Sequence, residues 1–81
     1  MADRDALERA LLAELQQWWG GLNTRLFDGA MRPPVLALSD TIRQLGRWER
    51  ATRHISMSRA FVAGVSWGEV VEVLKHEMAH Q

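Results

Sequence analysis

The spacing of apolar residues predicts a long helix at the start of the chain. Leucines and one tryptophan recur every three or four positions, which places them on a single helical face. The members of this stripe are Leu7, Leu11, Leu15, Trp18, Leu22 and Leu26. We expect Trp18 rather than its neighbour Trp19 to occupy the core face. Gly20-Gly21 is a weak point where the helix can kink or break, and Gly29 is the expected left-handed cap after its end.

Short extended segments follow this helix. The apolar run Val35–Leu38 predicts one strand, and residues 46–50 predict a weaker one. Residues 53–58 alternate, so that Ile55 and Met57 point to one side of a third strand. We expect residues 46–50 and 53–57 to pair antiparallel through a turn between them.

The last segment predicts a second long helix with a defined start. Ser66 and Glu69 match the capping box. In this motif the Ser66 hydroxyl accepts a hydrogen bond from the amide of residue 69, and the Glu69 carboxylate accepts one from the amide of residue 66. An apolar stripe of Val70, Val71, Leu74 and Met78 follows. The expected fold is therefore α+β, with a long N-terminal helix, a small three-stranded and mainly antiparallel sheet, and a C-terminal helix. Both long helices are expected on one side of the sheet.

The C-terminal helix carries the pattern H-E-x-x-H, formed by His76, Glu77 and His80. Residues four apart share one helical face, so two imidazoles can reach one zinc ion at about 2.0–2.1 Å. Glu77 lies about 100° further around the helix axis. Its carboxylate can then accept a proton from a zinc-bound water instead of binding the metal. The motif predicts His76 and His80 as metal ligands and Glu77 as the general base.

A third zinc ligand is missing from this pattern. A catalytic zinc site uses three protein ligands and a water molecule. His54 is the only other histidine, and we interpret it as a surface residue on the non-core face of its strand. The predicted cofactor is therefore zinc with its third protein ligand absent from this chain.

Composition narrows the possible classes of protein. The chain has 81 residues, which is one domain, and no cysteine, which excludes disulfides and cysteine-ligated zinc or iron–sulfur sites. No apolar run approaches the ~20 residues of a membrane span, and no signal sequence is apparent, so we expect a cytoplasmic protein with no membrane partner. Lysine and arginine balance aspartate and glutamate at ten each.

Charge is uneven along the chain despite this balance. Residues 31–65 hold six arginines against two acidic residues, a net charge of +4. This middle segment suggests an alternative function, a non-catalytic module that binds metal, protein or nucleic acid. Its candidate contacts are Arg43, Arg47, Trp48 and Arg50. A solvated strand edge with scattered arginines is the simpler interpretation of the same residues.

The order of these segments resembles the N-terminal part of the SprT-like zinc metallopeptidases, the family that includes Spartan-type DNA–protein crosslink proteases. The resemblance covers Trp18 to Gln81. It rests on Asn23, on Leu26-Phe27-Asp28-Gly29, on the strand Val35–Leu38, on Leu45-Gly46, on Ile55-Ser56-Met57-Ser58 and on the helix Val70–His80. Only the zinc motif is specific by itself, while the order and spacing of all the segments carry the resemblance.

The resemblance implies a zinc-dependent peptidase that hydrolyses peptide bonds through a zinc-bound water, with Glu77 as general base. Its substrates would be proteins or peptides, with DNA as a possible partner. A strand formed by Arg53, His54, Ile55, Ser56 and Met57 would align the substrate. The family's third ligand is a histidine well downstream, so residues 1–81 are interpreted as an incomplete zincin-like domain. Such a fragment is expected to be inactive alone and to associate with a second copy.

Overall fold

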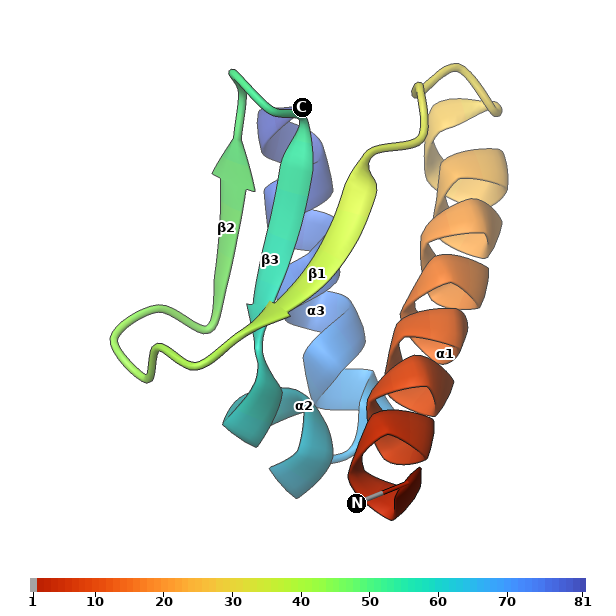
Figure 1. Ribbon diagram of the computed structural model, residues 1–81. Coiled ribbons are helices and arrows are strands. Elements are labelled where there is room, and N and C mark those ends of the chain that lie inside the picture. Colours follow the sequence, from red (N-terminus) through yellow and green to blue (C-terminus); the bar gives the residue numbers. More distant parts are fainter. Residues whose placement is uncertain (1) are drawn as a thin grey trace.

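Two long helices lie on one face of a three-stranded sheet in the computed structural model, which describes residues 2–81 (Figure 1). In chain order the elements are α1 (Ala2–Phe27), β1 (Val35–Ser39), β2 (Gly46–Glu49), β3 (His54–Ser58), α2 (Arg59–Gly64) and α3 (Trp67–His80). The expected α+β class is confirmed. Within residues 2–81, no helix combines the length and the apolar character that crossing a membrane requires.

The sheet has the strand order β1-β3-β2. The β2–β3 hairpin is antiparallel as predicted, with Trp48 opposite Ile55. In contrast, β1 and β3 run parallel, with Leu36 opposite Ile55. The sheet is therefore mixed rather than mainly antiparallel. The reason is that β3 inserts between the two earlier strands, so that β1 meets β3 and does not pair with β2.

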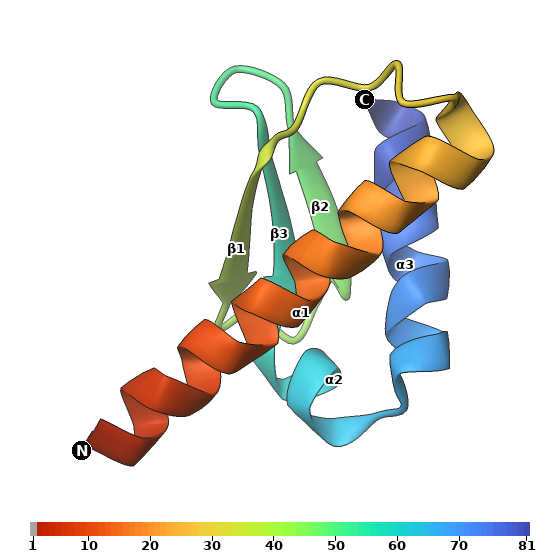
Figure 2. The ribbon, with the colours of Figure 1, turned by 90° about the vertical axis from the view of Figure 1, so that its right-hand side faces the viewer.

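The two faces of the sheet differ in chemistry. Ile55 and Met57 of the central strand are fully buried beneath the helices, which confirms the alternation seen in the sequence. His54 and Ser56 alternate with them and so lie on the opposite face. No helix among residues 2–81 covers that face, which is turned toward the viewer in Figure 1 and lies away from α1 and α3 in Figure 2.

Helix α1 contributes Leu15, Trp19 and Leu22 to the core. It runs without interruption through Gly20-Gly21, so these glycines do not break it. The expectation that Trp18 is the core tryptophan is wrong. Trp19 follows Leu15 by four residues and is 6% exposed, whereas Trp18 is half-buried. The Trp18 indole N–H donates to the Glu14 carboxylate at 3.3 Å, near the helix surface.

The predicted stripe is also shorter than expected at both ends. Leu7 is 56% exposed and Leu26 is 55% exposed. Helix α1 reaches beyond the sheet at its N-terminal end (Figure 2), so the outer part of the stripe has less to pack against. The buried residues of α1 therefore lie between Leu15 and Asn23.

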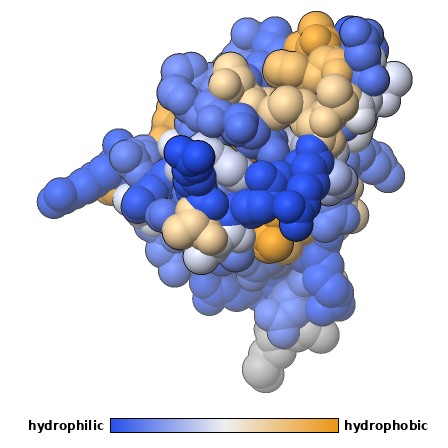
Figure 3. Space-filling model, turned by 90° about the horizontal axis from the view of Figure 1, so that it is seen from above, coloured by the Kyte–Doolittle hydropathy of each residue, from blue (hydrophilic) through white to orange (hydrophobic). Residues whose placement is uncertain are grey.

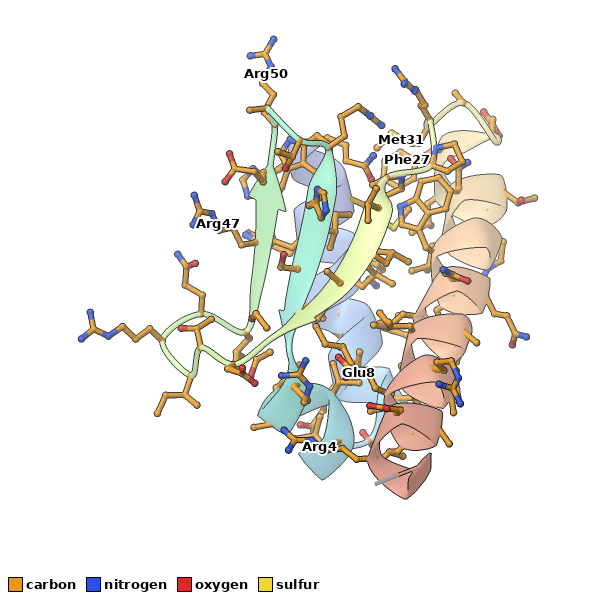
Figure 4. All side chains as sticks on the ribbon, in the orientation of Figure 1. Arg4, Glu8, Phe27, Met31, Arg47 and Arg50 are labelled. Atoms are coloured by element: carbon orange, nitrogen blue, oxygen red, sulfur yellow. The ribbon has the colours of Figure 1, made fainter. Side chains whose placement is uncertain are left out.

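A left-handed turn ends α1 as the sequence predicts. Gly29 has φ of +73°, and Asp28 before it has φ of +55°. Asn23 then fixes the returning chain with two hydrogen bonds. Its amide group donates to the Met31 carbonyl and its carbonyl accepts from the Met31 amide, each at 3.0 Å. Figure 4 shows Met31 beside Phe27 at this end of the molecule.

An ion-pair cluster ties α1 to the opposite end of the sheet. Ser58 caps α2, and its hydroxyl accepts from the Phe61 amide. Arg59 follows at the N-terminus of α2, where the helix dipole disfavours a cation. Two carboxylates compensate, because Arg59 pairs with Glu8 of α1 at 2.5 Å and with Asp40. The hydrogen bond with Glu8 raises the pKa of Arg59, which stays charged.

Candidate metal centre

The helix that carries the motif begins where the capping pattern predicts. The Ser66 hydroxyl accepts a hydrogen bond from the Glu69 amide at 3.4 Å, and Ser66 has the extended backbone of an N-cap. The reciprocal bond from the Glu69 carboxylate is not formed. One half of the predicted capping box is therefore confirmed, and it fixes the start of α3.

The rotation of α3 sets the exposure of each motif residue. Val70, Leu74 and Met78 are fully buried and form the core side of the helix. His76 and His80 are exposed, while Glu77 between them is only 7% exposed. The histidines thus lie at the border of the core, as the helical periodicity predicts, and the carboxylate lies deeper.

The two imidazole rings converge on one point. Nε2 of His76 and Nε2 of His80 are 3.2 Å apart, with the ring planes at 84° to each other. Two nitrogen ligands at 2.0–2.1 Å from a tetrahedral zinc ion would lie about 3.3 Å apart. The spacing of the pair therefore fits two ligands of one zinc ion.

A third metal ligand does not join this pair. No cluster of three or more histidine, cysteine, aspartate or glutamate residues suited to a metal ion occurs among the described residues. His54 lies on the open face of the sheet, where its Nδ1 is 3.0 Å from the Thr52 carbonyl oxygen. The sequence-based interpretation of His54 as a residue outside the metal site agrees with this position.

A shallow groove between β2 and α3 contains the whole motif. It is lined by Gln44, Gly46, Arg47, Trp48, Arg50, His76, Glu77 and His80. No hydrogen bond or ion pair to the Glu77 carboxylate is found among the described residues, and its oxygens are not sealed from solvent. Glu77 can therefore bind a water molecule in the groove, beside the histidine pair.

The strand expected to align a substrate is in the wrong place for that role. Residues 54–58 form β3, the central strand, whose main chain is paired on both sides. Strand addition needs a free edge, so the expectation for Arg53, His54, Ile55, Ser56 and Met57 is wrong. The edge strand that lies against α3 is β2, Gly46–Glu49. Among the described residues, the outer edge of β2 has no partner strand.

Three of the four candidate nucleic-acid contacts border the same groove. Arg47 and Trp48 belong to β2, and Arg50 belongs to the turn after it. Figure 4 shows Arg47 and Arg50 projecting away from the sheet, and Arg47 pairs with Glu49 at 2.9 Å. Trp48 is half-buried, with the Arg53 guanidinium 5.2 Å from its ring centroid. Arg43 lies in the loop before β2 and does not line the groove.

The surface at this end of the molecule is mainly polar. Seen from above, hydrophilic residues surround separate apolar patches rather than one continuous apolar surface (Figure 3). Arg50 and the turn that carries it are exposed. The groove is therefore accessible to a charged or polar ligand.

Comparisons with known proteins add no assignment to this geometry. No protein-family model, no curated protein and no solved structure matched the chain. The site is thus described by its own residues.

Sequence reasoning missed two features of this region. The first is Gly46, where a side-chain carbon would come within 2.9 Å of Val73 Cγ1 and 3.1 Å of Glu77 Cγ. The second is Gln81, which is hydrogen-bonded to Trp19. A glycine that opens a strand is a known sign of close backbone approach and could have indicated the first. No local pattern indicates the second, because the two residues are far apart in the sequence.

Proposed function

We propose that this chain supplies two zinc ligands and the general base of a zinc-dependent peptidase of the SprT-like type. The observation that carries the proposal is the 3.2 Å separation of the His76 and His80 Nε2 atoms beside the Glu77 carboxylate. A hydrogen bond between two neutral imidazoles has the same length, so the separation supports a metal site together with the neighbouring Glu77 and not by itself.

The residues of the groove have separate roles in this proposal. Zinc, when bound by His76 and His80, would supply Lewis-acid polarisation of the scissile carbonyl and acidify a water molecule. Glu77 would act as the general base, holding a proton taken from a water molecule in the groove and delivering it to the leaving amine. Its carboxylate suits this role because no described residue competes for it.

The free edge of β2 provides a place for an extended substrate. A peptide that adds to this edge would form main-chain hydrogen bonds and would pass the motif face of α3. Main-chain pairing reads little of the substrate sequence, so the expected selectivity is weak. The proposal also requires a third protein ligand from outside the described residues, since His76 and His80 are the two that converge here.

Zinc titration of the protein as the cell makes it tests the metal site. His76→Ala and His80→Ala should each abolish stoichiometric binding. His54→Ala is the matched control, because it removes the remaining histidine from the opposite face of the sheet and should leave binding unchanged. Binding that survives both motif substitutions, or that is lost equally in His54→Ala, would contradict the site.

Peptide hydrolysis by the protein as the cell makes it tests the mechanism. Glu77→Gln keeps the size of the side chain and removes its basicity. We expect a loss of about 10²–10⁴-fold in hydrolysis, the usual contribution of a general base, with zinc still bound. Retained hydrolysis in Glu77→Gln would contradict the assignment of Glu77.

A binding role for the arginines around β2 is the alternative. It is favoured by Arg50, which is exposed and borders the groove. Under this alternative, an oligonucleotide would bind with an affinity that falls steeply with salt concentration. Arg50→Gln should make this salt dependence less steep, and Glu77→Gln should leave it unchanged. Binding insensitive to both salt and Arg50→Gln would contradict it.

A further inference from the structure

The side chain of Gln81 joins three segments that are distant in the sequence. Its Oε1 accepts a hydrogen bond from the Trp19 indole N–H at 3.1 Å, which links the end of α3 to α1. Its Nε2 donates to the Arg32 carbonyl at 3.2 Å, which adds the loop that follows α1. In Figure 2 the C-terminal end of α3 lies beneath this loop.

Both partners of Gln81 are themselves fixed. Trp19 is 6% exposed, and a buried indole N–H without an acceptor is unfavourable. The loop is held next to Arg32 by the two hydrogen bonds between Asn23 and Met31. Gln81 is therefore attached to a rigid part of the molecule rather than to a mobile surface.

The attachment bears directly on the histidine pair. His80 lies in the last turn of α3, next to Gln81, whereas His76 lies one turn earlier. A displacement of this turn would carry the His80 ring away from His76. The Gln81 amide hydrogen-bonds into α1 and the loop, while its main-chain N–H bonds the Met78 carbonyl at 3.1 Å.

We propose that Gln81 is a positioning residue for His80. Through Trp19 and Arg32 it holds the last turn of α3 in place and keeps the two Nε2 atoms at the spacing of metal ligands. The expected effect on zinc affinity rests on the function proposed above, whereas the expected effect on the distance between the two rings does not.

A metal-free measurement tests the positioning itself. Gln81→Leu keeps much of the side-chain volume and removes both hydrogen bonds. In nuclear magnetic resonance spectra we expect the contacts between the His76 and His80 ring protons to weaken and the Trp19 indole N–H signal to shift. Gln16→Leu, an exposed glutamine of α1 without a side-chain hydrogen bond, is the matched control. Ring contacts that persist unchanged in Gln81→Leu would overturn the proposal.

Metal affinity provides the second readout. Residues that orient metal ligands commonly contribute about 10–100-fold to affinity, and we expect a loss in this range for Zn²⁺ and Co²⁺ in Gln81→Leu. Trp19→Phe removes the donor together with part of the buried ring system and should give a loss in the same direction. The double variant should lose little more than Gln81→Leu alone, because both changes remove the same hydrogen bond.

The ring-contact measurement and the metal-affinity measurement together distinguish failure of this inference from failure of the proposed function. If the protein as the cell makes it binds no zinc, the proposed function fails, and the ring contacts still decide the role of Gln81. If zinc binds equally well to the unaltered chain and to Gln81→Leu, the positioning role fails and the proposed function stands. If circular dichroism shows that Gln81→Leu does not fold, Trp19→Phe replaces it in both arms.

Discussion

Gly46 packs against Glu77 so closely that no unstrained space is left for a side chain between them. A carbon in the Cβ position of Gly46 would lie 3.1 Å from Glu77 Cγ and 2.9 Å from Val73 Cγ1. The close approach of the edge strand β2 to the motif helix α3 is thus possible because Gly46 has no side chain. The depth of Glu77 in the groove depends on this contact.

Gly46→Ala should therefore disturb the site as well as the fold. Overpacking of this kind costs about 1–3 kcal/mol in the free energy of unfolding, which denaturant titration can measure. We also expect hydrolysis to fall more than zinc affinity, because the added methyl group presses on Val73 and Glu77, whereas no histidine atom is among its nearest neighbours. A variant with unchanged stability and unchanged hydrolysis would show that β2 and α3 are not in this contact.

Gly21→Ala should raise the free energy of unfolding, in contrast to Gly46→Ala. Gly21 lies inside α1, and nothing lies within 4 Å of the position that a Cβ would take. Alanine in a helix interior is about 0.5–1 kcal/mol more favourable than glycine. We expect the unfolding midpoint in denaturant to rise accordingly. A decrease would indicate that α1 is bent or broken at Gly20-Gly21, as the sequence alone suggested.

The adjacent tryptophans of α1 form a matched pair. Trp19 is buried in the core, whereas Trp18 is half-buried and bonds to Glu14. Truncation of a buried tryptophan to alanine costs about 3–5 kcal/mol, which is a large part of the total stability of a small domain. Trp19→Ala should thus unfold the protein or nearly so, while Trp18→Ala should leave a cooperative transition. The reverse order in thermal unfolding would assign Trp18 to the core.

The elements themselves could be predicted from the sequence because each follows a local rule. Apolar spacing marked α1, alternation marked β3, and Ser66 marked the start of α3. The convergence of His76 and His80 is also local, since both lie on one helix four residues apart. For this reason the centre of the site was accessible from the sequence, and the structure adds the distance between the two rings.

The order of the strands could not be obtained in the same way. A hairpin places β2 beside β3 whichever of them is the outer strand, and only the position of β1 decides. β1 pairs with β3, which makes β2 the edge strand beside the motif and excludes residues 54–58 from that role. Trp19 was misplaced because Trp18 and Trp19 both fit the helical spacing from Leu15. Contacts across the fold select between them.

Asn23 should be a second anchor of the region near Gln81. Its side chain satisfies both the N–H and the C=O of Met31, and it is only 8% exposed. Asn23→Ala leaves these main-chain groups without partners, at a cost of about 1–3 kcal/mol for an unsatisfied buried group. Asn23→Asp keeps the acceptor but removes the donor to the Met31 carbonyl, so it should also be destabilising.

Thr24→Ala is the control for this prediction. The Thr24 hydroxyl is exposed and donates only to the Gly20 carbonyl of its own helix at 3.1 Å, so its loss should change stability by less than about 0.5 kcal/mol. Hydrogen exchange at the Met31 amide is the most direct measurement. It should accelerate in Asn23→Ala and stay slow in Thr24→Ala, because only the first change removes the acceptor of that amide. Equal protection in both variants would show that the loop is held by other contacts, in which case Arg32 would also be a less rigid partner for Gln81.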